Sequence, residues 1–238
     1  MKINDILMDS IHVCRKNPLV FVPMLASVVI VTLLSLVLVG SMTPFTGMTT
    51  PEQIMAGAGA ALGSIMLFSI LTMLLSLLAH GMTVIMAFDA VEGRKVTLQD
   101  GWSRTLERIV PLVIASVIVG LLLGVGFALL VLPGLILLLF LMFTFTAIMV
   151  DRNDAFRAIT TSFRMTAHNF GTVFVLFLVI IALGVLFALA NMIVSLIPVL
   201  GALVAILLSC AFSGYLSVFI LQAYLSLRET PPAPDVEV

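Results

Sequence analysis

The sequence predicts an all-α integral membrane protein with six transmembrane helices arranged as three hairpins. Each hairpin is preceded by an amphipathic helix at the cytoplasmic interface. Two observations support this fold class. The 238-residue chain is 62% hydrophobic and 10% charged, whereas a soluble domain carries roughly 25% charged residues. Its Lys and Arg residues also fall into four groups separated by long apolar stretches, at 2–16, 94–108, 152–164 and Arg228.

The first hairpin is predicted from residues 18–40 and a second helix that can run from about residue 50 to Ala90. A spanning helix needs about 20 apolar residues. Thr50-Pro51-Glu52-Gln53 is a favourable helix start, with a capping threonine and a proline in the first turn. This helix would be roughly 60 Å long, about twice the hydrocarbon thickness. We therefore expect it to protrude, tilt or bend, with Gly63 and Gly81 as bend points.

The second and third hairpins are each predicted from one long uncharged stretch that a proline and a glycine interrupt. Pro-Gly is a strong turn signal. Leu132-Pro133-Gly134 separates spans at 109–131 and 135–150. The segment from Ile197 to Gly201, which contains Pro198, separates spans at 171–196 and 201–226.

The topology follows from the side on which the positive charges lie. Two spans separate each basic group from the next, so all four groups face the same side of the membrane. The positive-inside rule places that side in the cytoplasm. We therefore predict a multi-pass protein of the cell membrane with both termini cytoplasmic. Residues 1–228 form a single six-span domain, and residues 229–238 form a short cytoplasmic tail.

The three amphipathic segments precede the hairpins and share a helical spacing of apolar residues. The first, residues 4–16, places Leu7, Ile11 and Cys14 on one face. The second opens with Thr97-Leu98-Gln99-Asp100, which has the spacing of a capping box. The third starts at Asn153-Asp154. Helices that are basic on one side and apolar on the other lie in the membrane interface.

The aromatic and basic residues of the second and third segments are the candidates for contact with lipid headgroups. The second segment carries an apolar stripe of Leu98, Trp102, Leu106 and Ile109. The third alternates phenyl rings and arginines. The candidate interface residues are Trp102, Arg104, Arg108, Phe156, Arg157, Phe163 and Arg164.

The segment around the third amphipathic helix resembles a known family. Pro133-Gly134 precedes a span, Asp151 follows it, and Ser162-Phe-Arg164-Met-Thr-Ala-His-Asn169-Phe170-Gly171 leads into the next span. This layout resembles membrane proteins of the glycerophosphoryl-diester phosphodiesterase membrane-domain type, with Phe163 where a tryptophan is usual. The resemblance implies a shared fold and ancestry without the catalytic domain, for which this chain has no space. Many members of that family are stand-alone proteins of unknown function.

Five polar residues are predicted to lie within the spans: His80, Asn191, Ser209, Ser213 and Ser217. An ionisable group inside a membrane is a functional candidate, although a histidine hydrogen-bonded within the bundle is the plainer interpretation. The three serines and Asn191 could line a path for a polar solute, or they could support helix packing. Gly59 with Gly63, and Gly120 with Gly124, have the small-xxx-small spacing of close helix contacts.

The chain carries no motif that predicts catalysis. The three histidines and two cysteines do not have the spacing of metal ligands. The sequence also shows no recognisable catalytic triad of a nucleophile, a base and an orienting group. The expected function is therefore a non-enzymatic integral membrane module that acts through lipids or a protein partner. The alternative is a small-solute permease or exporter, and an integral membrane enzyme comes third. We expect no cofactor, no metal and no nucleic acid, and membrane lipids, a membrane protein or a second copy of the chain as partners.

Overall fold

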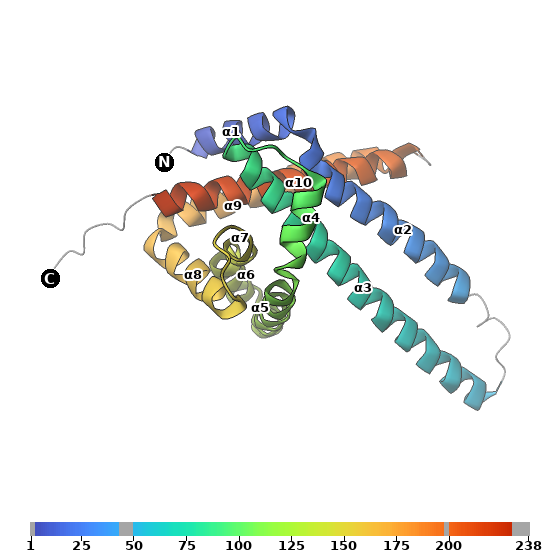
Figure 1. The fold of residues 1–238 in the computed structure, drawn as a ribbon. Coiled ribbons are helices and arrows are strands. Elements are labelled where there is room, and N and C mark those ends of the chain that lie inside the picture. Colours follow the sequence, from blue (N-terminus) through green and yellow to red (C-terminus); the bar gives the residue numbers. More distant parts are fainter. Residues whose placement is uncertain (1–2, 43–49, 198–199, 230–238) are drawn as a thin grey trace.

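The computed structural model describes residues 3–42, 50–197 and 200–229, which form helices and the turns between them. The chain folds as three successive units (Figure 1). The first contains α1 (Ile3–Lys16), the 3-10 helix η1 (Pro18–Phe21), α2 (Val22–Met42) and α3 (Pro51–Val91). The second contains α4 (Leu98–Leu106), α5 (Ile109–Leu129), α6 (Val131–Leu141) and α7 (Thr144–Val150). The third contains α8 (Ala155–His168), α9 (Phe170–Val194) and α10 (Leu200–Glu229).

Six segments of the described residues are long and apolar enough to cross a membrane. They are Pro18–Leu38, Ala61–Val91, Ile109–Leu129, Val131–Val150, Phe170–Val194 and Leu203–Arg228. Amphipathic helices α1, α4 and α8 precede the three pairs in chain order. The predicted fold class, an all-α multi-pass membrane protein of three hairpins, is confirmed. The predicted tail, residues 229–238, lies outside the described residues except for Glu229 at the end of α10.

Helix α3 is one continuous helix of 41 residues, without a break at Gly63 or Gly81. A Cβ atom at Gly63 would meet open space. At Gly81 it would lie 2.5 Å from a methyl carbon of Thr105, so this glycine allows α4 to approach α3. The helix is roughly 60 Å long, and its N-terminal part extends with α2 well away from the other helices (Figure 1).

The turn between α5 and α6 lies earlier than predicted. The single residue Leu130, in an extended conformation, connects the two helices, and Pro133 and Gly134 belong to the first turn of α6. A proline is tolerated there because the first N–H groups of a helix have no intrahelical partner. Gly134 faces α5, where an added Cβ would lie 2.5 Å from the ring of Phe127.

The turn between α9 and α10 falls where the sequence predicts it. Helix α9 ends at Val194 and α10 begins at Leu200, although residues 198–199 of this turn lie outside the described part. A Cβ at Gly201 would collide with the carbonyl oxygen of Val194. Only glycine therefore fits where α10 passes the end of α9.

The buried face of α1 overlaps the predicted face only in part. Cys14 is buried as predicted and Leu7 is partly buried against the core, whereas Ile11 is 50% exposed and Ile6 and Ser10 are buried. The difference arises because α1 packs along α10, so the contact with this helix decides which stripe is covered. Burial also raises the pKa of the Cys14 thiol to about 11, which keeps it protonated at neutral pH. Both Cys14 and Cys210 are free.

The buried core lies near the end of the bundle that carries the amphipathic helices. Fully buried side chains include Ile85 and Met86 in α3, Leu176 in α9, and Phe219 and Tyr224 in α10. The opposite halves of the spans expose large apolar side chains, for example at 33–37, 62–71 and 185–197. The α2–α3 hairpin and the α9–α10 hairpin diverge from this core (Figure 1). Packing within the chain therefore holds the three hairpins together mainly at one end.

The glycines that make close helix contacts differ from the predicted pairs. Added Cβ atoms at Gly59, Gly63, Gly120 and Gly124 would all meet open space. The predicted packing role of these four is therefore wrong within one chain. Gly214 in α10 makes such a contact instead, since an added Cβ would lie 2.5 Å from the ring of Phe21. Small residues allow this close approach of helices in membranes.

The fourth span is broken between α6 and α7, and a side chain from α8 fills the break. The Ser162 hydroxyl donates to the carbonyl oxygen of Phe140 at 2.7 Å and accepts from the N–H of Phe143 at 3.2 Å. Ser162 is fully buried. A break within a span is tolerated where such partners satisfy the freed backbone groups.

We expect Ser162→Ala to destabilise the protein by about 1–3 kcal/mol, because the variant leaves buried backbone groups without a partner. The measurement is unfolding by a denaturing detergent in mixed micelles. Thr160→Ala is the matched control, since the Thr160 hydroxyl is exposed and bonds only to its own helix. Equal stability of the two variants would contradict this role for Ser162.

Candidate functional site

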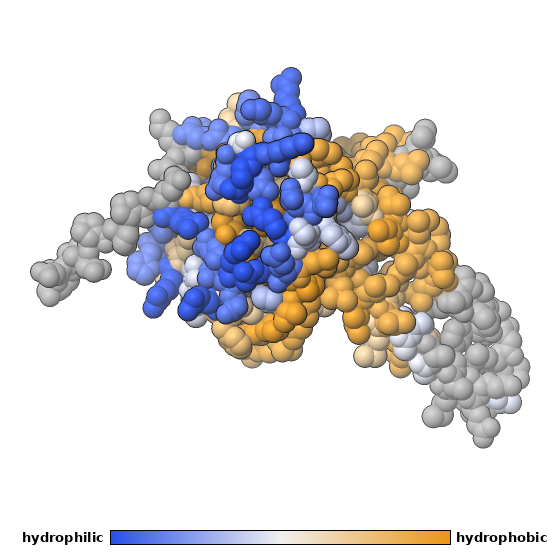
Figure 2. Space-filling model, in the orientation of Figure 1, coloured by the Kyte–Doolittle hydropathy of each residue, from blue (hydrophilic) through white to orange (hydrophobic). Residues whose placement is uncertain are grey.

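The hydrophilic side chains gather over α1, α4, α8 and the C-terminal end of α10 (Figure 2). We call this surface the charged face. It contains all the predicted interface residues, which belong to α4, α8 and the N-cap of α5. The spans extend away from it as apolar surface (Figure 2).

The first polar cluster of the charged face surrounds Asp89, near the end of α3. This residue is only 4% exposed. Its carboxylate accepts from Arg94 Nε at 2.8 Å and from Arg104 Nη1 at 2.9 Å. Gly93, with a positive φ of 71°, turns the chain, and the Arg94 N–H donates to the Asp89 carbonyl at 2.8 Å. Arg104 therefore fastens α4 to α3, and its guanidinium is engaged with a protein carboxylate.

Helix α4 begins with the predicted cap. Thr97 Oγ1 accepts the N–H of Asp100 at 3.2 Å, and the Thr97 hydroxyl donates to the Asp100 carboxylate. Gly101 and Thr105 face α3 and are buried. Of the predicted apolar stripe, Leu98, Trp102 and Leu106 are exposed, and Ile109 is partly buried. This is the orientation expected of an interfacial helix, with its apolar stripe available to lipid.

The second cluster surrounds Asp151, which follows α7. The Tyr224 hydroxyl donates to the Asp151 carboxylate, and Arg228 Nη1 lies 2.8 Å from Asp151 Oδ1. Arg152 adopts a left-handed conformation with φ of 55°, and its carbonyl oxygen accepts from Arg108 Nη1 at 3.1 Å. Arg108, predicted as a headgroup contact, thus makes a hydrogen bond within the protein.

The sequence reasoning missed this second cluster. Asp151 and Tyr224 are 73 residues apart, and no local spacing connects them. Tyr224 is one of two tyrosines in the chain and lies in a long apolar run. A buried tyrosine hydroxyl requires a hydrogen-bond partner, and that requirement was the only available signal.

Helix α8 has three distinct faces. Small residues form its buried face: Ala155, Ala158, Ser162 and Thr166. Arg157 and Arg164 are seven residues apart, so they share a second stripe of the helix. Both are exposed, and neither makes an ion pair with any described residue. Phe156 and Phe163 share the third stripe, about 100° from the arginines.

The two phenyl rings of α8 have different surroundings. Phe156 is 71% exposed and projects from the helix. Phe163 stacks on Phe140 of α6 with ring centroids 4.5 Å apart, and Phe140 in turn lies near Phe170 at the start of α9. Phe163 therefore attaches α8 to the broken span, and Phe156 is the ring available to lipid.

His80 lies in α3 beside the broken span. Its Nδ1 is 3.0 Å from the carbonyl oxygen of Ser76, one turn earlier. His80 and Ser76 line a cavity of about 260 Å³ between α3, α5, α7 and α10, and Thr146 of α7 also lines it. The other lining residues are apolar, apart from Gly81. His80 thus combines a bond within its own helix with access to a small, mostly apolar cavity.

The other four intramembrane candidates do not line the cavity beside His80. The Ser209 hydroxyl donates to the Ala205 carbonyl at 2.7 Å, and the Ser217 hydroxyl donates to the Ser213 carbonyl at 3.0 Å. These bonds lie within α10, the usual arrangement of a helical serine. Neither Asn191 nor any of the three serines lines the cavity beside His80. The packing interpretation therefore describes the serines better than a solute path does.

Metal ligands do not cluster in the described part of the chain. Within residues 3–42, 50–197 and 200–229, no three His, Cys, Asp or Glu side chains are grouped so that they could hold a metal ion. The acidic residues with the least exposure, Asp89 and Asp151, bind arginines instead.

The fold and the charged face define a six-span, all-α membrane protein with amphipathic helices at one end of its bundle. Residues 1–227 match the family described as Domain of unknown function (DUF7847), and the chain belongs to that family. No curated protein and no solved structure matches the chain.

Proposed function

We propose that this protein is a non-enzymatic integral membrane module that binds membrane lipids, anionic headgroups among them, at the charged face. The observation that carries the proposal is the surface of α8. There, Arg157 and Arg164 are exposed without an ion pair to any described residue, beside the exposed ring of Phe156.

The physical basis is the attraction between these arginines and an anionic leaflet. A cation near such a surface contributes about 1 kcal/mol, and a guanidinium binds phosphate oxygens in a bidentate way. The ring of Phe156 lies on the neighbouring stripe of α8, where it can enter the acyl boundary. The two stripes together suit a helix lying along the membrane surface.

Two carboxylates that are paired with arginines support the non-enzymatic part of the proposal. Asp89 and Asp151 are the least exposed acidic groups among the described residues, and both pair with arginines. A general acid or base must instead be able to exchange its proton with a substrate. The polar clusters of the charged face therefore act as fastenings between helices.

We also propose an orientation in the membrane and an ancestry for this chain. By the positive-inside rule, the proposed orientation has the charged face and both termini in the cytoplasm, and the proposed location is the cell membrane. The resemblance of residues 133–171 to the glycerophosphoryl-diester phosphodiesterase membrane-domain type supports a common origin of α6 to α8 and the start of α9. A membrane-protein partner or a second copy of the chain could cover the apolar surfaces where the hairpins diverge.

The test is lipid retention by the Arg157→Gln, Arg164→Gln double variant, measured by native mass spectrometry after extraction from mixed neutral and anionic vesicles. Two lost contacts of about 1 kcal/mol each predict a fall in anionic-lipid retention of roughly tenfold or more. Neutral-lipid retention should not change. High salt should reduce the difference between the wild type and the variant, because it screens surface charge.

The matched control removes the same charge from α1, in the Arg15→Gln, Lys16→Gln variant. Both residues are exposed but lack a neighbouring aromatic stripe. We expect this control to retain clearly more anionic lipid than the α8 variant. Equal retention by the wild type and the α8 variant would refute the proposal.

A small-solute permease is the second candidate function. The observation that favours it is the break between α6 and α7 beside the cavity of His80 and Thr146, because discontinuous helices line the substrate sites of many transporters. It ranks second because that cavity is mostly apolar and because the Ser162 hydroxyl already satisfies backbone groups at the break.

A further inference from the structure

We propose that a groove between α2, α3 and α4 holds one acyl chain of a membrane phospholipid from the leaflet on the side of the charged face. The inference deepens the proposed function and rests on it in making lipid the ligand. It concerns a different surface from α8 and requires none of the α8 arginines.

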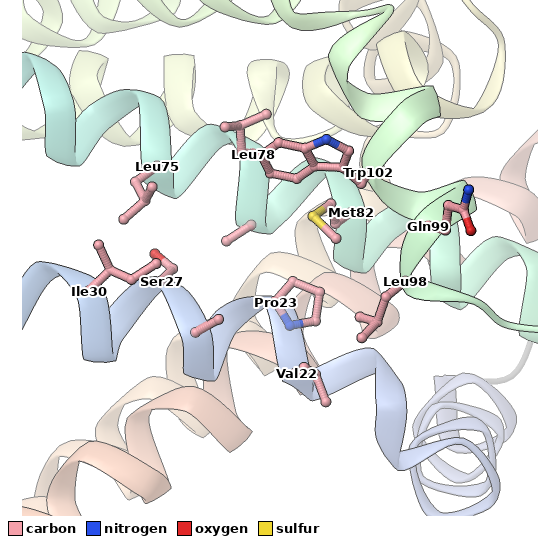
Figure 3. A pocket seen from close by; sticks show the side chains of 12 residues that line it. Val22, Pro23, Ser27, Ile30, Leu75, Leu78, Met82, Leu98, Gln99 and Trp102 are labelled. Atoms are coloured by element: carbon pink, nitrogen blue, oxygen red, sulfur yellow. The ribbon is translucent and has the colours of Figure 1, made fainter.

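The walls of the groove are almost entirely apolar. Val22, Pro23 and Ile30 of α2 line one side, and Leu75, Leu78 and Met82 of α3 line the other (Figure 3). The only polar side chains in its lining are those of Ser27 and Gln99, in addition to the indole N–H of Trp102. The groove has a volume of about 390 Å³, within the range of roughly 300–1,000 Å³ of small-molecule sites.

The groove has the length and direction of a lipid chain. Its lining runs along α2 from Val22 to Ile30, which corresponds to about 12 Å at 1.5 Å per residue. One leaflet contributes about 15 Å of hydrocarbon. Since α2 and α3 are spans, a chain lying along them follows the direction of the neighbouring lipid chains.

The two closed sides of the groove distinguish it from an ordinary lipid-facing surface. Met24, Ala79 and Cys210 form a small buried cluster behind it, where α2, α3 and α10 meet. Helix α4 closes the end near the charged face, and the Trp102 ring extends from α4 to lie beside Leu78 (Figure 3). An acyl chain in the groove would therefore contact protein on several sides.

A lysine precedes, in the sequence, the residues of α4 that line the groove. Lys95 lies three residues before Leu98, which lines the groove. Lys95 is exposed and makes no ion pair within the described residues. A tryptophan at this level matches the preference of indole rings for the membrane interface. This combination of an apolar groove, an interfacial indole and a cation favours a phospholipid over the helix of a partner protein.

The experiment uses the full chain in vesicles that contain phosphatidylcholine with a photoreactive diazirine in its acyl chain. Mass spectrometry then maps the lipid adducts. We expect adducts to concentrate on residues 22–30 and 75–82, at several times the yield on exposed faces of α5 and α9. Ala26→Phe, which fills the groove from an exposed position, should lower the yield in these segments at least fivefold. Ala128→Phe, at an exposed position outside the groove, should leave it unchanged.

A second groove-filling variant and the α8 double variant complete the experiment. Ile30→Trp fills the same groove from its other end and should have the same effect if Ala26→Phe fails to fold. The α8 double variant should keep the wild-type adduct pattern, because the probe is zwitterionic, so failure of the proposed headgroup site would not affect this result. Adducts spread evenly over the spans, or unchanged by both groove-filling variants, would overturn the inference. A groove without lipid adducts because a second copy of the chain covers it would overturn the inference as well.

Discussion

Asp89→Ala is expected to destabilise the protein by about 3 kcal/mol, which is the low end of the range for breaking a buried ion pair. Asp89 is the nearly buried acceptor for both Arg94 and Arg104, so its loss leaves two guanidinium groups without their carboxylate. The low end applies because Arg94 is half exposed and can turn toward water. Unfolding by a denaturing detergent in mixed micelles measures the effect.

Glu92→Ala is the matched control for Asp89. Glu92 also pairs with Arg94, but at an exposed position, and such pairs contribute about 0–1 kcal/mol. Replacing both members of the Asp89–Arg104 pair, in the Asp89→Leu, Arg104→Met double variant, should recover part of the stability that Asp89→Ala loses. An apolar pair avoids the cost of burying charge. If Asp89→Ala and Glu92→Ala cost the same, Asp89 does not fasten α4 to α3.

The spans were predictable because the bilayer imposes a length on each apolar stretch. About 20 residues without charge are required, and the chain alternates such stretches with basic groups. Within a stretch, however, the sequence located the turn near Pro133 only to within a few residues. A proline fits the first turn of α6 as well as it fits a loop, and the contact of Gly134 with Phe127 decides between the two.

The candidate site was only partly predictable, because distant partners determine what each residue does. Helical spacing correctly placed Trp102, Phe156, Arg157 and Arg164 on exposed surfaces. Helical spacing could not show that Arg104 forms an ion pair with Asp89, because that pairing depends on how α4 packs on α3. For the same reason, the α1 stripe was predicted only in part: Cys14 is buried as predicted, whereas Ile11 is exposed.

The predicted glycine pairs also show that local spacing does not reveal which distant residues pack against a helix. A small-xxx-small spacing shows that one face of a helix is small, but it does not show what lies opposite that face. The predicted pairs in α3 and α5 face open space, whereas Gly214, without a predicted glycine partner, touches an aromatic ring. The role of a glycine in a span therefore depends on the packing of the whole bundle.

Gly214→Leu should accordingly be among the most destabilising single changes in the chain. A Cβ at this position would lie 2.5 Å from the Phe21 ring, and a rigid ring cannot move aside cheaply. Overpacking of this kind costs typically 1–3 kcal/mol and occasionally more, and we expect about 3 kcal/mol. The contact joins η1 of the first unit to α10 of the third, so the variant should also loosen the α2–α3 hairpin.

The matched control is Gly120→Leu, because Gly120 is also a helical glycine but an added Cβ there meets open space. Both variants replace glycine with a good helix former, so the difference between them reports the packing around Gly214, with Phe21 as the nearest contact. We expect Gly120→Leu to match or slightly exceed the wild type in detergent unfolding. Combining Gly214→Leu with Phe21→Ala should restore part of the lost stability, since the smaller side chain makes room for leucine. Similar unfolding curves for Gly214→Leu and Gly120→Leu would show that α10 does not pack against η1 at this glycine.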